Sequence, residues 1–359
     1  MNRKITLTFV AILIITASYS QKELKDYEET YYVTFSGTHP GQIIHKGNNW
    51  DILVAFKNKG KLEKLNDLKI EYSQKQIDIL CALNFLEKKD DTYRTLVTIL
   101  NENDTKEIRF FTKEIAVNIS KLIKNDFLTL QNDLKQIGFE NNTYSILFSN
   151  IMDNIVWDLF EQNNILPKKD ITVEKPIWDG TIWFNYPKRE FQCGTNSREI
   201  DNLVFATNWT DNSDISLKEI EKKSILNELI SNSKISDNVL ITSLKPYGIC
   251  DDKGNILIPY FRQGTSSEII KYSELIAETI YDYLLNNVNF TKINAKYNIQ
   301  SNGDAIIIVY HDIMWDIMDI FEEDGLIKKP VAFSNPEKAV ASDLKDLLII
   351  YEKRLPTKK

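Results

Sequence analysis

Two stretches that lie 161 positions apart decide the fold: YSILFSNIMDNIVWDLFEQN at residues 144–163 and AIIIVYHDIMWDIMDIFEED at residues 305–324. In the first stretch, apolar residues recur at four-residue steps, as they do on the buried side of a helix. They are Leu147, Ile151, Ile155 and Leu159. The second stretch aligns with the first without a gap and shares its Phe-Glu pair. We therefore predict that each stretch forms a core-facing helix.

The similarity extends well beyond these two stretches. A shift of 161 positions places Leu86–Lys169 over Tyr247–Pro330 without a gap, and 16 of the 84 aligned positions are identical. Similarity at a fixed internal spacing is typical of a structural unit that occurs more than once. Accidental register of two amphipathic helices is the alternative, but here a turn, a strand and two helices stay in step. We expect two tandem copies of one unit.

Each copy has the pattern of a helix, a β-hairpin and two further helices. In the second copy, Ser236–Leu244 has helical spacing, and Pro246 ends this helix. The turn at residues 251–254 predicts a hairpin into a strand over 256–261, because Gly254 takes the positive φ that such turns require. The expected long helices cover residues 106–125 and 144–163 in the first copy and residues 267–286 and 305–324 in the second.

The predicted fold class is α+β, with two tandem copies of a helix-rich unit that carries a β-hairpin and a C-terminal capping helix over Asn335–Leu355. The predicted limits are a signal peptide at residues 1–20, the first unit at 21–170, the second unit at 171–331 and the C-terminal helix within 332–359. The order of helix, hairpin and long helix resembles the winged-helix family. Cytoplasmic winged helices commonly bind DNA, which is the activity that the resemblance implies.

The first twenty residues have the three parts of a bacterial-type secretory signal. Arg3 and Lys4 supply the charged start, an apolar run follows from Ile5 to Ala17, and small residues precede Gln21. The apolar run is shorter than the roughly 20 residues that a membrane-spanning helix needs. We expect cleavage before Gln21 and a mature periplasmic or extracellular chain without stable membrane insertion. An uncleaved anchor is the alternative.

The composition excludes some classes of partner. Without Arg3 and Lys4, 42 basic side chains stand against 51 acidic ones, which gives the mature chain a net charge of −9. Such a chain does not attract nucleic acid or an anionic membrane surface. Its three cysteines, Cys81, Cys193 and Cys250, form at most one bridge and are not a disulfide framework. The sequence leaves open whether any two of them are bridged.

One helix carries the strongest chemical pattern. Asp312, Asp316, Asp319 and Glu323 recur at steps of four, three and four, which aligns four carboxylates on one side of the helix, with His311 beside them. Histidine and carboxylates are ligands for divalent metals and can act as acid and base. An exposed acidic face is the alternative, and we predict no metal and no cofactor. His311, Asp312 and Asp316 are the candidate catalytic residues.

A group of aromatic residues lies at the start of the second copy. Exposed rings would suit stacking on a sugar or a peptide, whereas one face of a sheet could equally bury them. The candidate ligand-binding residues in this group are Trp178, Trp183, Tyr186 and Trp209. The sequence contains no phosphate-binding glycine loop, no Gly-x-Ser-x-Gly and no His-Glu-x-x-His.

These observations favour an exported, non-catalytic binding or assembly module. Its partner would be a protein or a glycan, bound in the groove between the copies or on the aromatic face of the second copy. The first alternative is an enzyme with a carboxylate and histidine site around His311 and Asp312. The second alternative is a nucleic-acid-binding winged-helix protein, which requires that the chain is not exported.

Overall fold

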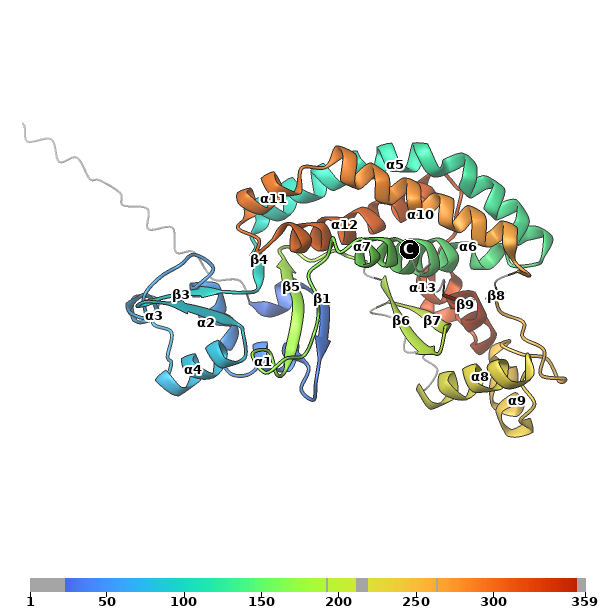
Figure 1. Ribbon diagram of the computed structural model, residues 1–359, viewed down its shortest axis with the longest axis horizontal. Helices are drawn as coiled ribbons and strands as arrows, with labels where there is room; N and C mark the ends of the chain where they lie inside the picture. The colour runs from blue at the N-terminus through green and yellow to red at the C-terminus, as the bar shows by residue number, and fades with distance from the viewer. Residues whose placement is uncertain (1–22, 192, 211–218, 263, 354–359) are drawn as a thin grey trace, which may run out of the picture.

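In the computed structural model, residues 23–191, 193–210, 219–262 and 264–353 are described (Figure 1). The predicted signal peptide, residues 1–20, lies outside them. Helices and strands are mixed along the chain, so the α+β class is confirmed. None of the described helices is long and apolar enough to cross a membrane.

The longest helices form one layer at the top of Figure 1, which we call the helical roof. Helix α5 packs against α10 and α12, and α10 also packs against a π-helical segment, η3. Helix α5 begins at a capping box, in which the Asn101 side chain accepts from the backbone N–H of Asp104 and the Asp104 carboxylate accepts from that of Asn101. The roof consists of α5 (Glu102–Gln136), η2 (Glu140–Asn142), α6 (Thr143–Ser145), η3 (Ile146–Ile155), α7 (Val156–Gln162), α10 (Ser267–Asn287), α11 (Phe290–Tyr297) and α12 (Asn302–Glu323).

A first lobe lies below one end of the roof and is built on a three-stranded sheet. Its strands run in the order β1 (Glu28–Phe35), β5 (Trp178–Asn185) and β4 (Thr98–Leu100). Strand β5 pairs antiparallel with β1 and parallel with β4, so β1 is an edge strand. The lobe has its own apolar core. Its other elements are η1 (Leu24–Asp26), α1 (Pro40–Ile44), α2 (Asn49–Ala55), α3 (Glu63–Asp67), α4 (Gln74–Ala82) and the hairpin of β2 (Leu86–Lys89) and β3 (Thr92–Thr95).

A second lobe lies below the other end of the roof and is built on a four-stranded sheet. Its strands run in the order β6 (Cys193–Ile200), β7 (Leu203–Thr210), β9 (Leu348–Glu352) and β8 (Tyr260–Phe261). Strand β6 is an edge strand of this sheet. The lobe also contains α8 (Glu219–Asn232), α9 (Asn238–Leu244) and η4 (Lys245–Tyr247).

The predicted C-terminal helix over 335–355 is wrong. Residues 332–353 contain only short helical turns and then strand β9. The apolar run 348–351 is buried, and β9 pairs with β7 on one side and β8 on the other. A central strand that is buried on both faces reads as a continuous apolar run, and such a run also satisfies a helical pattern. The short turns are α13 (Val331–Ser334), η5 (Pro336–Lys338) and η6 (Ala341–Leu347).

Two other predicted elements differ in extent. Helix α5 continues to Gln136, well beyond the expected end at residue 125. The expected strand over 256–261 is reduced to an isolated bridge at Ile256 and the two residues of β8. The predicted turn before it is present, with Gly254 at a φ of +77°.

Candidate functional site

A cleft of about 600 Å³ lies between the two lobes, beneath the helical roof. Edge strand β1 contributes to one wall and edge strand β6 to the other. Its lining includes Glu29–Tyr32 of β1, Cys193–Ser197 of β6, and Asp153, Trp157, Asp158, Glu161, His311 and Trp315 of the roof. A cleft between two lobes is a common position for a ligand site.

Aromatic rings form much of the cleft surface. The ring centroids of Tyr32 and Trp157 are 5.0 Å apart, and Trp157 is also 5.0 Å from the imidazole of His311. Trp209 lies over the backbone of Gly194 so closely that a Cβ atom there would stand 2.6 Å from the indole. Glycine at position 194 therefore allows the Trp209 ring to lie flat on strand β6.

The carboxylate of Asp153 is the unusual charge in this cleft. The indole of Trp157 donates a hydrogen bond to Asp153 Oδ1 over 3.1 Å, and Thr195 also bonds to this carboxylate. Within the described residues, no lysine, arginine or histidine forms an ion pair with Asp153. Burial raises the pKa of Asp153 to about 6. The cleft thus holds a carboxylate that only neutral groups of the protein bind.

Two neighbouring carboxylates do have cation partners. Lys169 Nζ is 3.3 Å from Glu161 Oε1, and the hydroxyl of Tyr32 donates to the same oxygen over 2.7 Å. Lys353 Nζ is 4.0 Å from Asp158 Oδ1. The ammonium of Lys169 also stands 3.5 Å from the centroid of the Tyr32 ring, so a cation already occupies one aromatic face.

His311 is a neutral hydrogen-bond acceptor at the roof of the cleft. Its Nδ1 is 2.8 Å from the carbonyl oxygen of Ile307, and because a carbonyl only accepts, the proton is on Nδ1. Burial lowers the pKa of His311 to about 4. No described residue bonds to Nε2, which is therefore free to accept a proton or a hydrogen bond.

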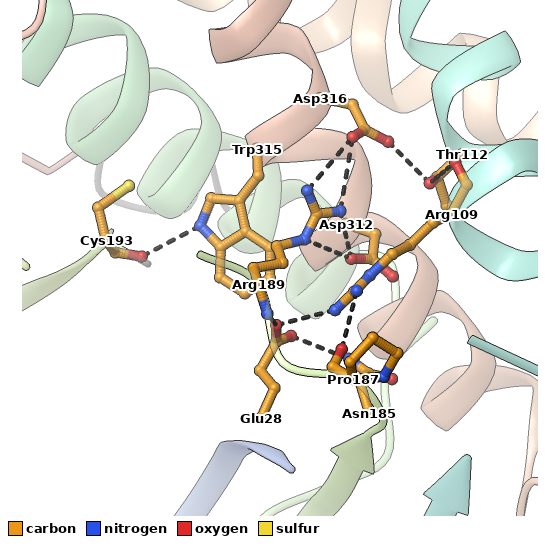
Figure 2. A network of polar contacts seen from close by, with 10 residues as sticks. All are labelled: Glu28, Arg109, Thr112, Asn185, Pro187, Arg189, Cys193, Asp312, Trp315 and Asp316. Atoms are coloured by element: carbon orange, nitrogen blue, oxygen red, sulfur yellow. Dashed lines mark hydrogen bonds and ion pairs between the residues drawn. The ribbon is translucent and has the colours of Figure 1, made fainter. Parts of the chain in front are cut away.

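Asp312 and Asp316 do not join His311 in the cleft. Figure 2 shows both bound to Arg189, whose Nη2 is 2.6 Å from Asp312 Oδ1 and 3.4 Å from Asp316 Oδ1. The hydroxyl of Thr112 donates to Asp316 over 2.7 Å. Both carboxyl groups are buried, and burial raises the pKa of Asp316 to about 6. The expectation of an exposed acidic face is wrong for these two residues.

Glu28 and Arg109 complete this cluster, which we call the buried ion network: Glu28, Arg109, Arg189, Asp312 and Asp316. Arg109 Nη2 and the backbone N–H of Arg189 both donate to Glu28 Oε2 over 3.0 Å (Figure 2). Burial, and then the nearby Asp312, raise the pKa of Glu28. The network joins β1, α5, the segment after β5 and α12, so it ties the first lobe to the roof.

The predicted aromatic residues separate into three environments. Trp178 and Trp183 are buried in the two apolar cores. Tyr186 packs on Tyr27, with ring centroids 5.4 Å apart. Among the four, only Trp209 lines the cleft.

Sequence reasoning missed Tyr32, Trp157, Trp315 and Asp153. Trp157 and Trp315 lie in the two aligned helical stretches, and a tryptophan within each amphipathic pattern is the available signal. Nothing in the sequence distinguishes Asp153 from an exposed aspartate.

The described residues meet the requirements of neither a metal site nor a reactive thiol. Among them, no group of three or more His, Cys, Asp or Glu side chains is arranged to hold a metal ion. The three cysteines are all described, and each is a free thiol. Burial raises the pKa of Cys193 to about 12, which makes its thiol unreactive.

Comparison with known proteins gives no family for this chain. No protein-family model, no curated protein and no solved structure matches it. The function must therefore be argued from the cleft.

Proposed function

We propose that this protein is an exported, non-catalytic binding module whose ligand, a peptide or a glycan, occupies the cleft between the two lobes. The observation that carries the proposal is the combination of a cavity of about 600 Å³, several aromatic rings and a carboxylate, Asp153, for which the described part of the chain supplies no cation. Such concave sites with few convergent polar groups are typical of ligand binding.

The charge of the cleft indicates which ligands it excludes. Four carboxylates line it, those of Glu29, Asp153, Asp158 and Glu161, against the ammonium groups of Lys169 and Lys353. An excess of negative charge repels phosphates and favours neutral or cationic groups. Nucleic-acid binding through a winged-helix-like unit is therefore not favoured.

A duplicated unit is part of the same proposal. Helices α5 and α11 end at Gln136 and Tyr297, and α7 and α12 end at Gln162 and Glu323, two pairs that are each 161 positions apart. The same shift carries Leu100 of β4 onto Phe261 of β8, and both strands pair parallel with the strand that follows their unit's last helix. These equivalences support one gene duplication, with the cleft at the junction of the copies.

The enzyme alternative has less support. Asp312 and Asp316, two of its three candidate residues, are bound by Arg189 and Thr112. His311 and Asp153 both line the cleft, and an acid of raised pKa in the same cleft as an imidazole is the one feature that favours catalysis. Turnover of a bound ligand would support this alternative.

Thermal melting of the mature chain with a panel of glycans and short peptides tests the proposal. A ligand of the cleft is expected to raise the melting temperature, and Trp209→Ala should weaken its binding by about tenfold or more, because buried aromatic anchors dominate interfaces. Phe110→Ala is the matched control, since this ring is 70% exposed on α5, outside the cleft. If a stabilising ligand binds both variants equally well, its binding site is outside the cleft.

A further inference from the structure

We infer that the cleft binds an extended peptide, which adds as a strand to the free edge of β6 and directs a lysine or arginine side chain to Asp153. This inference rests on the proposed function and narrows its ligand to one class. It is carried by two edge strands that line the cleft from opposite walls and by the carboxylate of Asp153, which has no cation partner among the described residues.

The hairpin register shows which backbone groups of β6 are free. Ile200 pairs with Leu203 across a two-residue turn, so these residues bond to each other, and the alternation of an antiparallel ladder follows from there. The N–H and C=O groups of Thr195 and Ser197 must therefore point away from β7. The indole of Trp315 confirms this direction, since it donates to the carbonyl of Cys193, which points the same way, over 3.1 Å.

The opposite wall presents a second free edge. The backbone N–H of Ser36 donates to the carbonyl of Ile177, which fixes the ladder of β1 and β5. By the same alternation, the backbone groups of Glu29 and Tyr31 point away from β5. No described residue forms a hydrogen bond to the outward backbone groups of Thr195, Ser197, Glu29 or Tyr31.

Open edges of this kind are normally protected. Proteins usually cover an edge strand, shorten it, or place lysine or proline on it. The cleft-lining part of β6 is Cys193-Gly-Thr-Asn-Ser197, which contains neither residue. An edge that is recessed in a cleft and left unblocked fits recognition by strand addition, in which backbone hydrogen bonds give the affinity and side-chain pockets give the specificity.

The position of Asp153 indicates which side chain of the peptide the cleft would bind. Thr195 of β6 bonds to this carboxylate, so a residue of a peptide paired with β6 would pass close to it. The other roof carboxylates that line the cleft, Asp158 and Glu161, already have lysine partners. A lysine or arginine of the peptide would supply the missing cation.

Two pools of capped heptapeptides test the inference on the mature chain. Both pools carry Ala, Ser, Thr or Val at random around a central residue, which is lysine in one pool and glutamate in the other. Direct titration should show binding of the lysine pool, with the glutamate pool weaker by about tenfold or more, because a charge-assisted hydrogen bond is lost and a like charge replaces it. Only every second amide of a paired peptide faces β6. N-methylation of those amides should therefore weaken binding of the lysine pool, and N-methylation of the amides between them should not.

Two variants of Ser197 test the same pairing by changing the protein instead of the peptide. Ser197→Pro removes an outward N–H and blocks pairing, whereas Ser197→Ala keeps the backbone intact and should bind as the wild type does. Proline is tolerated at an edge position of this kind, and melting temperatures report whether both variants fold. We expect Ser197→Pro to lose about tenfold or more in affinity for the lysine pool.

The outcomes distinguish this inference from the proposed function. Equal binding of the two pools, or equal binding by both Ser197 variants, would overturn strand addition at β6 with a basic side chain. Binding of a glycan that Trp209→Ala abolishes, without binding of either pool, would overturn the peptide inference and leave the cleft as a binding site. Absence of any glycan or peptide ligand would contradict both.

Discussion

Two helical segments of the roof whose sequences align, residues 144–163 and 305–324, hold aspartates in different environments. In α12, Asp312 and Asp316 are buried, and one guanidinium, that of Arg189, reaches both. In η3, Asp153 faces the cleft, and its hydrogen-bond donors among the described residues are neutral. The aligned positions are not the same, because a shift of 161 positions places Ile151 and Ile155 over Asp312 and Asp316.

This difference indicates which carboxylates are structural. Buried carboxylates that are paired and hydrogen-bonded hold elements together. Here Asp312 and Asp316 join α12 to the segment after β5 through Arg189. A carboxylate that a protein leaves without a cation in a cavity has a cost in free energy, and a ligand can offset that cost. The η3 segment is also π-helical. This form is rare in proteins, and where it occurs it is often at a functional site.

The largest effect is expected from Arg189→Ala. This change leaves Asp312 and Asp316 buried without their cation and should lower the free energy of unfolding by about 3 to 5 kcal/mol. Urea denaturation measures it. Arg198→Ala, at an exposed position of β6, is the control and should stay within about 0.5 kcal/mol of the wild type. Equal stability of the two variants would mean that the buried ion network is not structural.

A smaller effect of opposite sign is expected from Asp153→Asn. Burial raises the pKa of Asp153 from its ordinary value of 3.8 to about 6, so the folded state binds more protons than the unfolded state between these values, and stability falls as the pH rises through them. Asparagine removes this loss. At pH 7 the variant should be more stable by up to about 3 kcal/mol, and near pH 3 the two proteins should be equal. A variant that is less stable at pH 7 would show that Asp153 is structural.

The smallest effect is expected for an exposed ion pair, which can be compared with the buried ion network. Lys124 Nζ is 2.8 Å from Asp324 Oδ2, and this exposed ion pair joins α5 to α12. Lys124→Ala should change the free energy of unfolding by less than about 0.5 kcal/mol, because solvent screens the pair. Thermal melting at low and high salt measures it. A loss comparable to that of Arg189→Ala would remove the distinction between buried and exposed pairs.

Local pattern predicts the roof helices over 106–125, 144–163, 267–286 and 305–324, but not α11. The stripe from Leu147 to Leu159 and the aligned stretch 305–324 are indeed core-facing, although Ile155 and Leu159 are only half-buried. The pattern of 348–352 predicts a helix, but the segment is a strand because it pairs with β7 and β8, which lie far away in sequence. Periodicity alone cannot distinguish a fully buried strand from a helix.

The candidate site was predictable only in part. His311 and Trp209 do line the cleft. Asp312 and Asp316 were placed on a helix with the right spacing, but their role depends on Arg189, which reaches them from a loop more than a hundred residues away. Asp153 has no distinguishing neighbour in sequence. Its significance comes from the lobe that folds over it and from the absence of a cation partner among the described residues.

One titration tests the central claim most directly: the affinity of the lysine-centred heptapeptide pool for the wild type and for Asp153→Asn, at pH 5 and at pH 7. Other ionisable groups among the described residues face Asp153 or line the same cleft: Glu29, Tyr31, Tyr32, His39, Asp158, Glu161, Lys169, Cys193, Tyr310, His311, Tyr351 and Lys353. Comparison with the variant isolates Asp153 from all of them.

Because the pKa of Asp153 is about 6, the wild type should bind the pool about tenfold more tightly at pH 7 than at pH 5. Asp153→Asn should bind about tenfold more weakly than the wild type at pH 7 and should show no such change with pH. Equal affinity and equal pH dependence of the two proteins would contradict the account, because the carboxylate in the cleft would then have no part in binding.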